Sequence, residues 1–167
     1  RFNENITLEM IQLLIGSGVD LNKQNKVRNT PLHDLFEYNN ITPEIIQLLF
    51  DNGADFNIQN EEGDTPLHIL IRFNENITLE MIQLLIGSGA NFNIQNEYGN
   101  TPSHCLFRNR NITPEIIQLL IDSGIDFNKQ NIDGDTLSHC LFRNINITLE
   151  IIQLMIDLGA NFNIQNE

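Results

Sequence analysis

The sequence predicts an all-α fold, a solenoid in which short helix-turn-helix units stack side by side. The first observation is a repeated Thr-Pro-Leu-His or close variant, which occurs at 30–33, 65–68, 101–104 and 136–139. The second is a repeated Ile-Gln-Leu-Leu or Ile-Gln-Leu-Met, which occurs at 11–14, 46–49, 82–85, 117–120 and 152–155. Both patterns recur every 35 or 36 residues. A unit of this length holds one helix pair, which must stack on its neighbours to bury its apolar face.

The first half of each unit carries the signals of a turn that leads into a short helix, here called the A helix. In the unit that starts at Asn57, Gly63 can adopt a positive φ in the turn without steric cost. Thr65 is a good N-cap, and Pro66 stands at the first helical position, where a missing N–H costs nothing. A polar break begins at Asn74. We expect A helices at about 31–37, 66–72, 102–108 and 137–143.

The second half of each unit predicts a longer helix, here called the B helix. Thr78 is its expected N-cap, and Leu79, Ile82 and Leu85 recur at helical spacing. The stretch 87–89, Gly-Ser-Gly, ends it. We expect B helices at about 7–16, 42–51, 78–87, 113–122 and 148–157.

These units predict a single domain over residues 1–167. It consists of a partial unit with only a B helix at 1–24 and of full units at 25–59, 60–95, 96–130 and 131–167. Neither end shows an obvious polar cap, which soluble solenoids normally need. We therefore expect either a piece of a longer array or ends that stack on something else. The stretch RFNENITLEMIQLLIGSG occurs twice, at 1–18 and 72–89, which suggests recent duplication or copying.

Composition narrows the classes of partner. The net charge of −13 and a pI of about 4.5 disfavour nucleic acid and anionic membrane surfaces. No apolar run approaches the roughly 20 residues that a membrane helix needs. The two cysteines, Cys105 and Cys140, are too few for a disulfide scaffold and favour a reducing compartment, so an intracellular and cytoplasmic location is expected.

The unit resembles the ankyrin repeat. The residues that carry the resemblance are Gly-Asp-Thr-Pro-Leu-His at 63–68 and Leu-Leu-Phe-Asp-Asn-Gly-Ala-Asp-Phe-Asn at 48–57. The period is slightly longer than the usual 33, and the extra residues fall between the helices, where a longer loop is expected on the outer side. Arg28 stands where other units have the turn glycine, so that turn is expected to be strained or differently shaped. Leu137 replaces proline at the start of the last A helix.

The resemblance implies a structural role for the histidine in each unit, through hydrogen bonds to neighbouring backbone. These histidines are His33, His68, His104 and His139. A metal site would need several such rings to converge on one ion, and no Cys-x-x-Cys or His-x-x-x-His pair is present. Because a phosphate loop and a nucleophile elbow are also missing, we expect no enzyme activity, metal or cofactor. Cys105 and Cys140 lie in adjacent units, too far apart for a disulfide, and are expected to be packing residues.

The resemblance also implies that a protein partner binds a concave surface made of turn tips and the exposed face of the A helices. The residues expected there are Tyr38, Glu61, Glu62, Asp64, Arg72, Phe73, Glu97, Tyr98, Arg108, Asp133, Asp135 and Arg143. The acids could meet a basic partner or form a solvated edge. The arginines and aromatics could form a binding hot spot, or the arginines could pair with nearby turn acids inside the array.

A structural role is the alternative to partner binding. Uncapped ends would let whole chains stack end to end into oligomers or fibres, so the chain is expected to be a monomer or to self-associate in this way.

Overall fold

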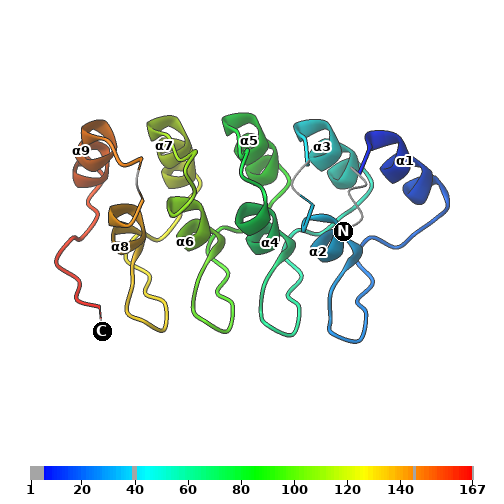
Figure 1. The fold of residues 1–167 in the computed structure, drawn as a ribbon, viewed down its shortest axis with the longest axis horizontal. Coiled ribbons are helices and arrows are strands. Elements are labelled where there is room, and N and C mark those ends of the chain that lie inside the picture. The colour runs from blue at the N-terminus through cyan, green and yellow to red at the C-terminus, as the bar shows by residue number, and fades with distance from the viewer. Residues whose placement is uncertain (1–5, 39–40, 145, 167) are drawn as a thin grey trace.

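Two layers of parallel helices make up the structure, a computed structural model that describes residues 6–38, 41–144 and 146–166 (Figure 1). The A layer holds α2 (Pro31–Leu35), α4 (Pro66–Phe73), α6 (Pro102–Phe107) and α8 (Leu137–Phe142). The B layer holds α1 (Leu8–Gly16), α3 (Pro43–Asp51), α5 (Leu79–Gly87), α7 (Pro114–Asp122) and α9 (Leu149–Asp157). In the described ranges there are nine helices and no strands, which confirms the all-α solenoid. The ends of the expected domain, residues 1–5 and 167, lie outside these ranges.

Every helix begins directly after a threonine, as the sequence predicts. In α5, the Thr78 hydroxyl accepts a hydrogen bond from the Met81 N–H at 3.2 Å. In α6, the Thr101 hydroxyl accepts one from the His104 N–H at 3.3 Å. These bonds satisfy backbone donors that the first helical turn leaves without a partner. α8 begins at Leu137 although proline is missing there.

The core lies between the two layers and runs the length of the array. From α1 to α7, each helix packs on the helix two places further along the chain, so α4 contacts α6 and α3 contacts α5. Aromatic pairs add to this core. Phe36 at the end of α2 and Phe56 after α3 are stacked, with ring centroids 6.0 Å apart. No helix in the described residues is long and apolar enough to cross a membrane.

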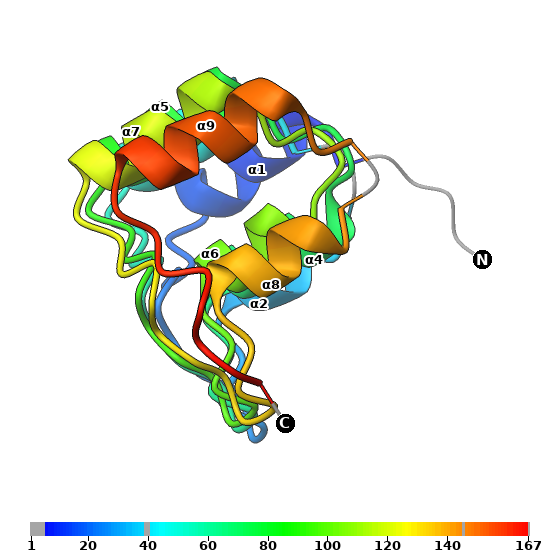
Figure 2. The same cartoon turned by 90° about the vertical axis from the view of Figure 1, so that its left-hand side faces the viewer.

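Side-chain hydrogen bonds join each unit to the next in regular columns. The Asn57 amide donates to the Gly89 carbonyl at 2.9 Å and accepts from the Asn91 N–H at 2.7 Å. The Gln59 amide donates to the Gln95 carbonyl at 3.0 Å. The same glutamine bond occurs from Gln24, Gln95 and Gln130, each to the carbonyl about one unit further on. Seen from one end, the units superpose and their turn tips project together from one side (Figure 2).

The turn that contains Arg28 keeps the shape of its neighbours. Asn25 N–H donates to the Asn29 carbonyl at 2.8 Å, and Asn60 N–H donates to the Asp64 carbonyl at 2.9 Å in the next unit. Arg28 has a φ of 60°, whereas Gly63 at the same place has a φ of 73°. A residue with a Cβ is strained in this left-handed region. The expected strain is therefore present, but it falls on Arg28 and not on the turn geometry.

Replacing Arg28 by glycine is expected to raise the free energy of unfolding by about 0.5–1 kcal/mol, because relief of the strain exceeds the entropic cost of glycine. Urea denaturation followed by circular dichroism measures the change. Arg28→Ala is the control, because it removes the long side chain and keeps the strained Cβ. Equal gains in both variants would show that the side chain, and not the backbone conformation, is unfavourable.

Candidate functional site

The four histidines lie at the joints between units. In each, the backbone N–H of the preceding N-cap threonine donates to the ring Nδ1, at 3.0 Å for Thr65 and His68. Nε2 of three rings bonds a backbone carbonyl of the next unit: His33 to Asp64 at 3.0 Å, His68 to Asn100 at 3.0 Å and His104 to Asp135 at 3.1 Å. Each of these rings therefore ties a helix start to the neighbouring turn tip.

These bonds fix the charge state of the buried rings. Because a backbone N–H can only donate, Nδ1 must accept, and Nε2 carries the proton that bonds the carbonyl. If Nδ1 were protonated, its N–H would face the threonine N–H, and two donors without an acceptor between them repel. Burial lowers the pKa of His68 to about 4, although the Asn100 carbonyl acts in the opposite direction. Burial likewise lowers the pKa of His33 and of His104. These three rings are neutral at physiological pH.

Two of the twelve residues expected on the binding surface are buried instead. The side chains of Asp64 and Asp135 are each 1% exposed. In both cases the residue follows the turn glycine, and its N–H donates to the preceding turn asparagine, at 2.9 Å from Asp64 to Asn60. The expectation that Asp64 and Asp135 project from the tips toward a partner is therefore wrong.

The buried acids are paired with the arginines of the same surface. Arg72 Nη1 lies 2.9 Å from Asp64 Oδ2. Both Nη atoms of Arg143 donate to Asp135, with Nη2 at 3.1 Å from Oδ1. The hydrogen bond and charge of Asp135 raise the pKa of Arg143. Burial alone would raise the pKa of Asp135, but the bonds from Arg143 and Asn166 outweigh it and lower that pKa. The pairing of arginines with turn acids is thus present.

The arginines nevertheless remain available to solvent. The side chains of Arg72 and Arg108 are each 40% exposed, and that of Arg143 is 56% exposed. Arg108 reaches Asp135 only at 3.4 Å, through Nη2. The acids therefore hold one side of these guanidinium groups and leave the other side free to contact a partner.

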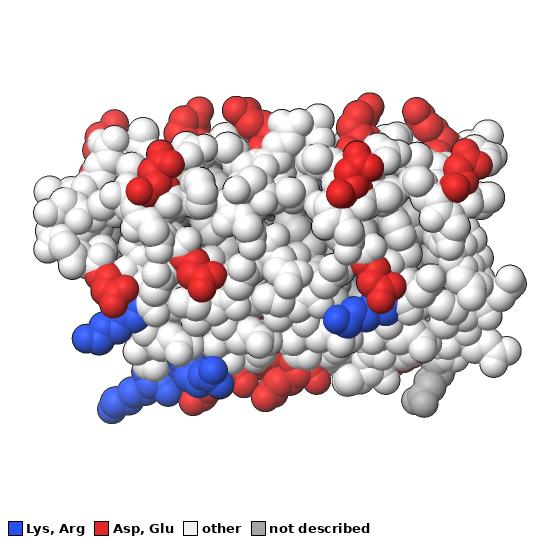
Figure 3. All heavy atoms as spheres, turned by 180° about the vertical axis from the view of Figure 1, so that it is seen from behind, with Lys and Arg blue, Asp and Glu red and all other residues white. Residues whose placement is uncertain are grey.

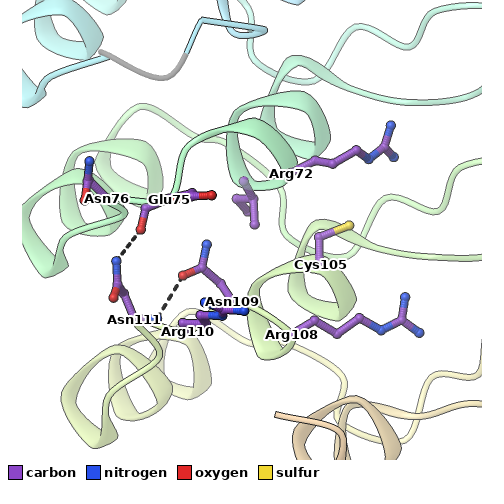
Figure 4. A pocket seen from close by; sticks show the side chains of 9 residues that line it. Arg72, Glu75, Asn76, Cys105, Arg108, Asn109, Arg110 and Asn111 are labelled. Atoms are coloured by element: carbon purple, nitrogen blue, oxygen red, sulfur yellow. Dashed lines mark hydrogen bonds between the residues drawn. The ribbon is translucent and has the colours of Figure 1, made fainter. Parts of the chain in front are cut away.

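A cavity of about 600 Å³ lies beside the arginines, between the ends of α4 and α6 and the loops that follow them. Arg72 and Arg108 extend in the same direction with Cys105 between them, and Glu75, Asn76 and Asn109–Asn111 lie on the other side (Figure 4). The Asn111 amide donates to the Glu75 carbonyl and so joins the two loops. The longer loops, which were expected on the outer side, form a wall of this cavity.

The other residues expected on the concave surface are exposed. They are Tyr38, Glu61, Glu62, Phe73, Glu97, Tyr98 and Asp133. The view from behind shows acidic side chains along the edge that the B helices form and also lower on that face, where the basic side chains gather in a few places (Figure 3). The surface is therefore acidic in general, and concentrations of positive charge are local.

Sequence reasoning gave no role to Arg110 and expected Cys105 to be a packing residue, and both line the cavity. Arg110 lies in a loop between two helices, where no periodic pattern places a side chain. Burial raises the pKa of Cys105 to about 11 and also raises that of Cys140, so neither thiol is a reactive thiolate at neutral pH. Both cysteines are free.

In the part of the chain that the structure describes, no three His, Cys, Asp or Glu side chains are placed to hold a metal ion.

Comparison with known proteins agrees with this architecture. A search of curated proteins finds no match. A family model described as ankyrin repeats (3 copies) matches residues 2–78 and 74–166. Proteins of this kind are in general protein-interaction modules. Since the match spans nearly the whole chain, the chain belongs to the ankyrin repeat family.

Proposed function

We propose that this chain binds a partner protein on the concave surface, defined here by the exposed ends of the A helices, the turn tips and the cavity between Arg72 and Arg108. The observation that supports this most is the row of half-exposed arginines, Arg72, Arg108 and Arg143, anchored by buried aspartates. Anchoring reduces the side-chain entropy that a flexible arginine loses on binding.

Exposed aromatic side chains accompany this row. Phe73 follows Arg72 directly, and Tyr98 stands on the turn tip of the following unit. Arginine and aromatic residues supply much of the binding energy at protein interfaces. Arginine and aromatic side chains that are exposed together suit binding, and this is the function that the chemistry of the surface supports.

Replacing Tyr98 and Arg108 together by alanine is expected to weaken partner capture at least about tenfold, because interface hot spots contribute roughly 2 kcal/mol or more each. The melting temperature should stay unchanged, since both side chains are exposed and Asp135 keeps Arg143 as its partner. Quantitative pull-down from the source cell with the wild-type and variant chains as bait measures the loss. Capture of the same partner at the same level by both baits would refute the concave-surface assignment.

The matched control replaces Lys23 and Phe50, a basic and an aromatic residue that are exposed outside the concave surface. This double variant should capture the partner as the wild type does. Light scattering on the bait checks in the same experiment that the captured species is not a second copy of the chain. That alternative, stacking of whole chains, would use the apolar side chains that α1 exposes, such as Met10 and Leu14.

A further inference from the structure

An acid–arginine pair recurs in two units and is incomplete in the unit between them. Asp64 pairs with Arg72, and Asp135 pairs with Arg143, each eight residues further along the chain. In the intervening unit Asn100 stands at the acid position and Arg108 at the arginine position. Arg108 therefore has no carboxylate partner within its own unit. Its ion pair is with Asp135 of the next unit, at 3.4 Å, and Arg143 shares that carboxylate.

The missing charge leaves the surrounding structure unchanged. Oδ1 of Asp64 accepts a hydrogen bond from the Asn96 amide at 2.7 Å, and Oδ1 of Asn100 accepts the equivalent bond from Asn131 at 3.0 Å. The same bond is made to Asn29 and Asp135. Since an amide and a carboxylate oxygen both accept this bond, the position holds either residue. What the Asn100 unit lacks is the negative charge beside its arginine.

The cavity next to Arg108 concentrates positive charge. Its charged lining consists of Arg72, Arg108, Arg110 and Glu75. Arg72 is offset by Asp64, whereas Arg110 makes no ion pair within residues 6–38, 41–144 and 146–166. Arg108 shares the Asp135 carboxylate with Arg143. The positive charges of Arg108 and Arg110 are thus the least neutralised in the cavity, in a chain whose net charge is −13. The side chains of Arg72 and Arg108 extend in the same direction, with Cys105 between them (Figure 4).

We propose that an acidic segment of the partner protein places a carboxylate against Arg108, in the role that Asp64 and Asp135 fill in the neighbouring units. This inference rests on the proposed function and names the chemistry of the partner. A planar guanidinium binds a carboxylate through two parallel hydrogen bonds, as Arg143 does with Asp135.

The surroundings favour a protein segment over a nucleic acid. The exposed turn-tip acids Glu62, Glu97 and Asp133 lie along the same concave surface, and they repel a continuous phosphate backbone. A peptide can place one carboxylate at Arg108 and apolar side chains elsewhere, where Phe73 and Tyr98 are exposed.

Fluorescence anisotropy with the whole chain tests the inference. The probe is a labelled eight-residue peptide of alternating glutamate and glycine, and the matched probe has glutamine in place of glutamate. We expect the glutamate peptide to bind and the glutamine peptide not to bind. Arg108→Gln should weaken binding at least about tenfold, since hydrogen bonds between charged groups are the strong ones. Lys23→Gln removes the same charge from an exposed site elsewhere and should change binding less than about twofold.

A second variant supplies the missing carboxylate. In Asn100→Asp the new side chain keeps the bond from Asn131 and pairs with Arg108 as Asp64 pairs with Arg72. This variant should bind the glutamate peptide at least about fivefold more weakly, while its melting temperature does not fall. Asn52→Asp adds the same charge on the exposed end of α3 and is the control. Wild-type affinity in Asn100→Asp would overturn the inference, because the pairing site would then not be the binding site.

Two further results would also overturn it. One is equal loss of binding in Arg108→Gln and Lys23→Gln, which would indicate a general charge effect. The other is tighter binding of a ten-nucleotide single strand than of the glutamate peptide, with the same dependence on Arg108. The peptide assay uses neither the partner nor Tyr98. If the peptide fails to bind while the Tyr98 and Arg108 double variant still loses its partner, this inference fails and the proposed function stands.

Discussion

Replacing Leu85 by alanine is expected to lower the free energy of unfolding by about 3–5 kcal/mol, whereas the same change at Leu14 should cost less than about 1 kcal/mol. The two leucines hold the same position in helices of identical sequence, LEMIQLLIG, in α5 and α1. Leu85 is 0% exposed, between α3 and α7, and Leu14 is 56% exposed. Truncating a fully buried leucine leaves a cavity in addition to the lost transfer energy. Urea denaturation of the two variants and the wild type measures both changes.

Because α1 and α5 have the same sequence, comparing Leu14→Ala with Leu85→Ala removes every effect that is local to the helix. The caps are equivalent, because Thr7 accepts from the Met10 N–H and Thr78 accepts from the Met81 N–H. Helix propensity and the charge of the first turn are also the same, with Glu9 and Glu80 at the same place. A difference between the variants therefore reports packing between units. Similar losses at Leu14 and Leu85 would show that the helices are stable on their own and that stacking contributes little.

Lowering the pH from 6.5 to about 4 is expected to reduce the free energy of unfolding by about 3 kcal/mol through His68 alone. The ring is fully buried, and its folded pKa of about 4 lies below the unfolded value near 6.5. In this window the unfolded chain binds a proton that the folded chain does not, so stability falls as the pH falls. His33 and His104 have lowered pKa values and act in the same direction. Urea midpoints at half-unit pH steps measure the slope.

His68→Gln is the variant that isolates this effect. Its stability at neutral pH should be lower, because the bonds to Thr65 and Asn100 change, but its slope should decrease by up to about 1.4 kcal/mol per pH unit. Carboxylates with lowered pKa values, such as Glu9 and Asp135, lose their contribution at the acid end of this window and below it. They are the same in both chains, so the difference in slope reports His68. An unchanged slope in His68→Gln would mean that His68 is already protonated in the folded chain.

Helix positions could be predicted from the sequence because their signals are local. A threonine N-cap followed by proline or leucine and a helical apolar period precedes α3, α5 and α7, and these helices begin within one residue of the expected place. The ends are less well determined. α2 stops at Leu35 and not at residue 37, because the end of a helix depends on how the following loop packs.

The candidate site could be predicted only in part. Asp64 and Glu62 are both turn acids, and the sequence treats them alike, yet Asp64 is buried and Glu62 is exposed. The signal that separates them is the arginine eight residues after Asp64, which becomes meaningful once the same spacing is seen at Asp135. Exposure of α1 and burial of α5 could not be predicted from their residues, because an identical sequence is covered by a neighbouring unit in one case and not in the other.

The columns of histidine, glutamine and asparagine bonds between units have a genetic consequence. Most of their acceptors are main-chain carbonyls, as at Gly89, Gln95 and Asn100, and every residue type carries that group. The remaining asparagine bond needs only an Asn or Asp side chain, as at Asn100 or Asp64. A unit therefore makes the same chemical demand on any unit that follows it. Unequal recombination between near-identical stretches, such as 1–18 and 72–89, adds or removes whole units and leaves each new junction satisfied without compensating substitutions.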